Sequence, residues 1–334
     1  MGGIGLIRRI ASLNAKRNIG RIRPIRPISL IWSLAVVHLT ITSATQAQQQ
    51  LDGTARSQNV IVIVVDDQGW ADMSAYDHSP SDVRTPQIDR LARSGVLFTQ
   101  AYSAAPICSA ARAGWMTGRN PARWEAKASF NCGLPGPQTP TIAELLKQRG
   151  YTTARIGKSD YSNAGIHKQR GREYPLNHGY DEFLGFCAHG FDFFLLSQDI
   201  YDRTPDPRSH SASVGPLMHN RGTKEYKDGY LTEIFTDAAI DYVERHQEKP
   251  FFLTLSYNAV HHLVHQSPKR YLDKYGVKEI PNYDPDKDGK YGTWFKKHIT
   301  LGKRLLTQKC ASTISPISIA WTTISVVFSM PWIA

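Results

Sequence analysis

The sequence predicts an α/β protein in which a mainly parallel central sheet is flanked by helices. Runs of apolar, β-branched residues have the character of strands that are covered on both faces. Amphipathic segments separate these runs, and polar residues follow several of them directly. Strands that alternate with helices in this way are typical of a parallel sheet in an α/β sandwich.

The first predicted strand is the apolar run of residues 59–65. A helix is expected to start at Thr85 and Pro86 and to end at Gly95. Thr caps helices, Pro is favoured in the first turn, and Gly is favoured just after the last turn. Residues 96–98, which are Val, Leu and Phe, form a second candidate strand.

The same signals recur later in the chain. A second helix is predicted between Thr139 and Gly150, and residues 151–156 form the next candidate strand. A long amphipathic helix is expected over residues 231–243. Residues 251–257 are mainly apolar and predict another buried strand.

Polar residues follow three of these strands, and we expect them to meet. Asp66 and Asp67 follow the first strand, Lys158 follows the strand at 151–156, and residues 258–261 follow the last one. In α/β sheets, sites form beyond the carboxyl ends of the strands. Residues 187–230, rich in Asp, Ser, His and Pro, look like a long excursion that carries substrate contacts.

Composition limits the classes of function. The chain has 334 residues with 41% hydrophobic content, which is enough for a sizeable core. The net charge is +11, but residues 1–51 hold seven Lys and Arg and no acidic residue, which leaves about +4 for the remainder. That mild balance gives little support to a nucleic-acid surface, and no nucleic-acid partner is expected.

The N-terminal residues have the order of a secretory signal: a basic segment, an apolar run at 30–41, then small residues. We interpret residues 1–47 as a signal peptide and residues 48–58 as a linker, which predicts export to the periplasm or the extracellular space. The apolar run is short for a transmembrane helix, so no stable membrane span is expected. An uncleaved anchor is the alternative.

Adjacent carboxylates at the end of a strand are the first candidate site. Asp66 and Asp67 repel each other and raise each other's pKa unless a cation neutralises them. A hard divalent cation with oxygen ligands, Ca²⁺ or Mg²⁺, fits that need. A solvated Asp-Asp turn is the alternative.

A second candidate is Cys108, which alone would more often be a buried structural thiol. It is followed by Arg112 and by Thr117 and Gly118. This spacing resembles the signature of the sulfatases, in which a Cys is oxidised to a formylglycine aldehyde. The Asp-Asp-x-Gly sequence after the first strand, Gly-Lys at 157–158 and the segment ending in His261 also resemble that family, in its order.

The resemblance implies an alkaline-phosphatase-like sandwich and hydrolysis of a sulfate ester by covalent nucleophilic catalysis, assisted by a Lewis-acid metal. It also assigns a role to each matching residue. Cys108, as formylglycine, is the nucleophile and a metal ligand, and Asp66 and Asp67 are the other metal ligands. Arg112 orients the hydrated aldehyde, Lys158 contacts the sulfate, and His261 protonates the leaving group.

The cofactors implied are Ca²⁺ (or Mg²⁺) and the formylglycine modification of Cys108. The implied partners are a sulfated small molecule or carbohydrate and a maturase that generates the formylglycine. A phosphate or phosphonate ester hydrolase of the same superfamily is one alternative. An inactive truncated chain, or a binding protein that keeps the shape of the pocket, is another.

The sequence also departs from the family pattern. Ala110 stands where Pro is commonest, which bears on which maturase could act. The family usually continues Gly-Lys-Trp-His, and its His assists the hydrated aldehyde, but Asp160 occupies that position here. His178 is interpreted as a packing or turn residue, and His262 and His265 as surface residues.

The resemblance stops before the end of the chain. We expect residues 59–302 to be an incomplete N-terminal catalytic domain and residues 303–334 to be an aberrant tail foreign to the fold. The second pair of metal ligands, a further sulfate-binding Lys and the C-terminal subdomain of the family have no counterpart in this sequence. A frameshift near residues 303–318 is our hypothesis, and a genuine short or membrane-associated tail is the alternative.

Overall fold

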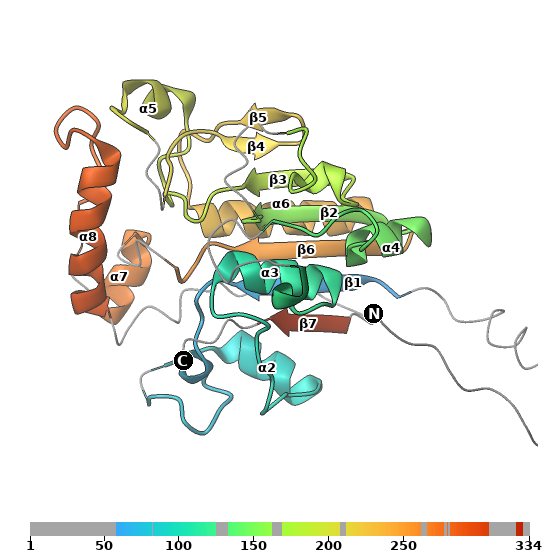
Figure 1. Cartoon of the computed structure of the whole chain (residues 1–334). Helices are drawn as coiled ribbons and strands as arrows, with labels where there is room; N and C mark the ends of the chain where they lie inside the picture. The colour runs from blue at the N-terminus through green and yellow to red at the C-terminus, as the bar shows by residue number, and fades with distance from the viewer. Residues whose placement is uncertain are drawn as a thin grey trace, which may run out of the picture. The chain divides into compact units, whose positions relative to one another are not determined.

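A computed structural model describes a single twisted sheet with helices packed on it (Figure 1). The described residues lie within the compact unit Ser57–Ala334 and are 58–81, 83–124, 133–161, 169–207, 212–261, 266–276, 279, 281–306 and 325–329. The predicted signal peptide, and the linker up to residue 57, lie outside them. Among the helices described, none combines the length and apolar character that crossing a membrane requires.

The sheet is mainly parallel, as predicted, with the strand order β5-β4-β3-β2-β6-β1-β7. Parallel pairing joins β3, β2, β6, β1 and β7, while β4 and β5 extend the β3 edge as an antiparallel hairpin. The strands are β1 (Val60–Val65), β2 (Thr152–Lys158), β3 (Glu182–Phe186), β4 (Leu217–His219), β5 (Gly222–Lys224), β6 (Phe251–Tyr257) and β7 (Ser325–Ser329).

Helices cover both faces of this sheet. The helices are α2 (Pro86–Ser94), α3 (Cys108–Thr117), α4 (Ile142–Gln148), α5 (Gln198–Arg203), α6 (Leu231–Arg245), α7 (Lys269–Tyr275) and α8 (Tyr291–Leu306). One core lies between the sheet and α6, and α3 and α4 pack on the opposite face (Figure 1). Within β1, Ile61 and Val65 face the α6 core, whereas Val62 and Val64 face the α3 core. Residues 60–65 are therefore apolar throughout because both faces of the strand are buried.

Two sequence predictions need correction. Residues 96–98 form no strand: Val96 is 79% exposed and Phe98 is 69% exposed, so this short apolar run has no buried face to pair and pack. The second helix starts at Ile142 with Thr141, not Thr139, as its cap. Thr141 and Glu144 form a reciprocal capping box there, which satisfies two backbone N–H groups that Thr139 would leave unpaired.

The C-terminal part of the chain contributes two elements. Helix α8 runs past residue 302, and β7, within the predicted aberrant tail, pairs in parallel with β1 from Val60 to Val64. The domain boundaries stay a prediction.

Candidate active site

Asp66 lies at the centre of a buried charge cluster at the carboxyl ends of β1 and β2. Its Oδ1 accepts a hydrogen bond from Arg112 Nη2 at 3.0 Å, and its Oδ2 accepts one from Lys158 Nζ at 2.6 Å. Burial alone would raise the pKa of Asp66, but the positive charges of Lys158, His261 and Arg112 hold it well below its usual range. The structure thus brings together residues from three separated motifs.

Helix α3 places Cys108 and Arg112 on one face because they are four residues apart. Arg112 also donates to Ser256 Oγ at 2.5 Å and to the Lys158 carbonyl at 3.2 Å, which ties the helix to β6 and β2. Gly118 adopts a left-handed conformation (φ 63°) and ends the helix. The Thr-Gly part of the motif therefore has a structural role: it closes the helix that begins at Cys108.

The end of β2 is fixed by buried contacts. Arg155 Nη2 donates to the carbonyls of Lys158 (2.7 Å) and Ser159 (3.2 Å), and Ser159 N donates to the Phe186 carbonyl at the end of β3 (2.8 Å). Gly157 is required here, because a Cβ at this position would lie 1.9 Å from the Ser256 carbonyl oxygen. These contacts fix the direction in which Lys158 and Asp160 leave the strand.

Asp160 is also fully buried and pairs with two basic groups. Its Oδ2 lies 3.2 Å from Lys158 Nζ, and its Oδ1 lies 2.5 Å from His189 Nδ1. Burial raises the pKa of Asp160, but Lys158 and the contact with His189 outweigh burial, and the net shift is downward. Asp160 is therefore a carboxylate in the folded protein.

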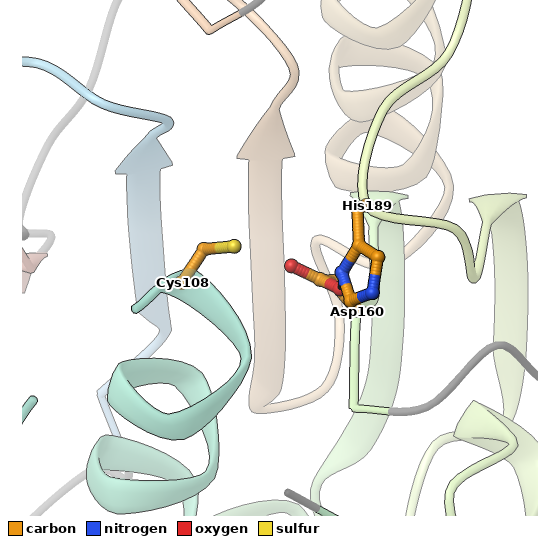
Figure 2. Close-up of side chains that lie close together, drawn as sticks. All are labelled: Cys108, Asp160 and His189. Atoms are coloured by element: carbon orange, nitrogen blue, oxygen red, sulfur yellow. Dashed lines mark ion pairs between the residues drawn. The ribbon is translucent and has the colours of Figure 1, made fainter. Parts of the chain in front are cut away.

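Cys108 faces this Asp–His pair (Figure 2). Potential ligand atoms of Cys108, Asp160 and His189 all lie within 4.8 Å of one another, and all three residues are buried. Burial raises the pKa of Cys108 to about 12; Lys158 acts in the opposite direction, and Asp160 and Asp66 add to the rise. Since the thiolate is the nucleophilic form, the unmodified side chain is a poor nucleophile at neutral pH.

No sequence motif points to His189. It lies three residues after β3, at the edge where Asp66 and Lys158 lie. His189 falls within residues 187–230, which the sequence predicts as a polar excursion with substrate contacts, but no motif there points to a particular residue. Recognition of β3 as a parallel strand would have pointed to His189.

Asp67 and His261 lie at the edge of the buried cluster. Backbone bonds from Asp66 N to the Ala259 carbonyl (2.9 Å) and from Val260 N to the Asp66 carbonyl (2.8 Å) join the two loops. His261 Nε2 lies 3.5 Å from Asp67 Oδ2. Burial and the charge of Asp66 raise the pKa of Asp67 to about 6.

The oxygen atoms at this edge suit a hard divalent cation. Asp66, Asp67 and Asp160 act on one another electrostatically, and the raised pKa of Asp67 reflects that crowding. Within the described residues, the buried Asn258 Oδ1, directly after β6, has no hydrogen-bond partner. Carboxylate and amide oxygens are ligands that Ca²⁺ and Mg²⁺ prefer. Lys158 and Arg112 already contact Asp66, so Asp67 has the greater remaining capacity to bind a cation.

Two further features lie outside this cluster. His178 is fully buried and Nδ1 donates to the Arg172 carbonyl at 2.8 Å, while its ring packs edge-on against Tyr161 and Tyr180. A cavity of about 590 Å³ lies between α6 and the β3–β5 side of the sheet, and none of the site residues lines it. His262 and His265 lie outside the described residues.

Comparisons with known proteins agree with this geometry. A family model described as Sulfatase matches residues 58–307. The chain is 30% identical over 233 residues to N-acetylgalactosamine-6-sulfatase of Canis lupus familiaris, which covers 64% of this chain and 42% of that protein. It is 41% identical over 140 residues to steryl-sulfatase of Mus musculus, covering 39% of this chain and 22% of that protein.

A solved structure supports the same fold. The crystal structure of Ps i-CgsB in complex with k-i-k-neocarrahexaose matches with a TM-score of 0.56 and 30% identity, covering 75% of this chain and 54% of that one. The chain thus spans about one fifth to one half of the length of these relatives.

Proposed function

Because the chain belongs to the sulfatase family, we propose that it hydrolyses sulfate esters with residue 108, converted to formylglycine, as the nucleophile. The observation that carries this proposal is the position of Cys108 at the start of α3, facing a buried cluster that contains Lys158 and Arg112. The raised pKa of the thiol supports it, because an unmodified side chain would contribute little nucleophilicity.

Lys158 and Arg112 are the candidate groups for the anionic substrate. Both are buried and stay protonated, since burial lowers their pKa values but the carboxylates of Asp66 and Asp160 raise them further. Positive charge fixed in a buried site stabilises the negative charge that develops on a sulfate ester during cleavage. The N-terminus of α3 adds a partial positive charge at the same place.

His261 is the candidate acid for the leaving alcohol. Its contact with Asp67 holds the ring at the edge of the cluster, where the leaving group of a bound ester would lie. Protonation of a leaving oxygen by a positioned imidazole contributes about 10²- to 10⁴-fold to rates in other enzymes.

Asp66 and Asp67 are the residues that would hold Ca²⁺ or Mg²⁺, together with residue 108. When bound, a divalent cation supplies Lewis-acid polarisation of a sulfate oxygen. The geometric role of the protein is to keep both carboxylates at the end of β1, where backbone bonds to residues 259 and 260 fix them.

The substrate class that we propose is a sulfated carbohydrate. The relatives include an N-acetylgalactosamine-6-sulfatase and a protein crystallised with a neocarrahexaose, although steryl-sulfatase shows that the family name also covers sterol esters. Export through residues 1–47 and a maturase that oxidises Cys108 belong to the same proposal. A catalytic domain at residues 59–302 is also part of this proposal.

The test combines chemistry at residue 108 with substrate preference. The full chain is produced in a host with a competent maturase, and mass spectrometry of the peptide that contains Cys108 measures the formylglycine fraction. Hydrolysis of an aryl sulfate and an aryl phosphate is then compared, before and after removal of metal by a chelator and refilling with Ca²⁺ or Mg²⁺. We expect preference for the sulfate and loss of turnover without metal.

A matched pair of cysteine variants provides the control. Cys187 is also a buried free cysteine, with its pKa likewise raised to about 12 by burial. Cys108→Ala should abolish turnover, and Cys187→Ala should keep it. An unmodified Cys108 throughout, or faster hydrolysis of the phosphate ester, contradicts the proposal; the second outcome favours a phosphate ester hydrolase.

A further inference from the structure

We propose that Asp160 and His189 act together as a proton-accepting dyad on residue 108, and this inference rests on the proposed function. Asp160 takes the position where the family usually has a His, so a different group must act on the side chain of residue 108. The dyad assigns that work to a carboxylate and a histidine from the loops that follow two neighbouring strands.

The geometry connects the three side chains in one buried group. Cys108, Asp160 and His189 have potential ligand atoms within 4.8 Å of one another, and His189 Nδ1 lies 2.5 Å from Asp160 Oδ1. His189 is 2% exposed and Asp160 is fully buried. In Figure 2, the Cys108 sulfur and an Asp160 oxygen point toward each other, and the His189 ring lies against Asp160.

The backbone holds the dyad in register with the nucleophile. Asp160 follows β2 and His189 follows β3, and the bond from Ser159 N to the Phe186 carbonyl joins these two strand ends at 2.8 Å. Asp160 itself adopts φ 55°, a left-handed conformation that turns the chain back after the strand. The loop therefore aims the carboxylate at the start of α3 and away from solvent.

The neighbouring charges set the protonation state of Asp160. Lys158 Nζ lies 3.2 Å from Asp160 Oδ2. The same ammonium stabilises Asp160 as a carboxylate, and His189 Nδ1 lies 2.5 Å from Oδ1 of that carboxylate. An acceptor for a proton is thus in place beside residue 108.

The step is the release of sulfate from residue 108. The O–H bond of the remaining hydroxyl on its β-carbon breaks, and the proton passes to the Asp160 carboxylate, which the contact with His189 holds beside residue 108. The electron pair of that bond forms the C=O bond. The bond between the β-carbon and the ester oxygen breaks, and sulfate leaves with its electron pair. Water later adds to the carbonyl and restores the hydroxyls.

The first test needs neither turnover nor maturation. In the unmodified protein, ¹H NMR should show a strongly downfield Nδ1 proton that belongs to His189. Asp160→Asn and His189→Gln should each remove this resonance, and His178→Gln, a change at another fully buried histidine, should leave it. If the resonance persists in Asp160→Asn, the dyad does not exist and the proposal is overturned.

The second test measures turnover of an aryl sulfate, normalised to the formylglycine fraction of each variant. Asp160→Asn and His189→Gln should each lower kcat by about 10²-fold, the usual contribution of a positioned acid or base. Asn and His both tolerate left-handed backbone, so changes at residue 160 should preserve the loop. Thermal unfolding checks that each variant is folded.

The third test replaces the dyad by a single imidazole at residue 160. In a His189→Ala background, Asp160→His places an imidazole next to residue 108 and should recover roughly tenfold of the lost kcat. A His189→Gln protein with kcat like that of the wild type overturns the dyad while the proposed function stands. A wild-type chain that carries formylglycine but shows no hydrolysis contradicts the proposed function, and the NMR result then decides the dyad by itself.

Discussion

Two polar clusters in this molecule use the same residue types in different ways. The site cluster (Asp66, Arg112, Lys158, Asp160 and His189) and the capping cluster (Thr141, Glu144, Arg172 and His178) each contain an Arg–carboxylate pair and a buried histidine. In the capping cluster the contacts end on backbone: Arg172 donates to the carbonyls of Pro135 and Thr139, and His178 to that of Arg172. In the site cluster, charges mostly contact other charges.

The difference distinguishes a cluster that stabilises the fold from one that is prepared for a ligand. Backbone partners are always present, so the hydrogen bonds of the capping cluster that end on carbonyls do not depend on a ligand. The site cluster holds several opposite charges in a buried place, where removal of one partner is costly but exchange for a charged ligand is possible. Substitutions in the two clusters should therefore affect stability and turnover differently.

The largest effect is expected from Lys158→Met. Asp66 and Asp160 would both lose their ammonium partner while buried, which should lower the free energy of unfolding by about 3–5 kcal/mol. Lys147→Met is the matched control, because Lys147 pairs with Asp181 at 2.5 Å but is 50% exposed, and its loss should cost less than about 1 kcal/mol. Urea denaturation measures both; equal losses would remove the distinction between buried and surface pairs.

The next effect is on turnover. Arg112→Lys keeps the charge but not the fork that contacts Asp66, Ser256 and the Lys158 carbonyl, so kcat/KM for an aryl sulfate should fall by about 10²-fold. Arg172→Lys makes the same change in the capping cluster and should leave kcat/KM unchanged. A similar loss in both variants would mean that the effect is on stability, which a melting curve would reveal.

A smaller effect concerns pH. Burial, aided by the charge of Arg155, lowers the pKa of His178 from 6.5 to about 3. Below pH 6.5, His178 therefore binds a proton in the unfolded chain but not in the folded chain, so stability falls as the pH decreases from 6.5 toward 3. His178 should lower the free energy of unfolding by about 1 kcal/mol between pH 7 and pH 5.5. Urea denaturation of the wild type and of His178→Gln at both pH values measures this loss. If the difference in unfolding free energy between the two proteins is the same at pH 7 and pH 5.5, the lowered pKa of His178 is contradicted.

The smallest effect should come from Thr141→Ala. The capping box at the start of α4 loses one side-chain acceptor, which should lower the unfolding free energy by about 1 kcal/mol. Thr141→Ser keeps the oxygen and should restore most of that value. Turnover should not change in either variant, and a change would show that the two clusters are coupled.

The sequence predicted the centre of the fold well because its strands are buried on both faces. The runs at 59–65, 151–156 and 251–257 became β1, β2 and β6, and the residues that follow them meet. Strands β3 to β5 were missed, since Glu182–Phe186 is short and contains a glycine, and β4 and β5 have three residues each. Periodicity carries little information over such lengths.

The sequence predicted only part of the candidate site. Motif spacing pointed to Asp66, Arg112 and Lys158, which the structure brings into direct contact. It could not point to His189, because that residue comes together with Asp160 through the pairing of β2 with β3, a tertiary contact that no local pattern encodes. From the sequence alone, Asp160 is a departure from the family pattern, and its contact with His189 is seen only in the structure.

The burial of Cys108 has a consequence for the order of events during biosynthesis. The residue is only 8% exposed at the start of α3, and its surroundings come from segments as distant as Lys158 and His189. A maturase of the kind proposed above would need to take that side chain into its own active site. Under that proposal, oxidation of Cys108 would precede docking of α3 onto the sheet, and the time that the chain spends unfolded after synthesis would limit how many molecules acquire the aldehyde.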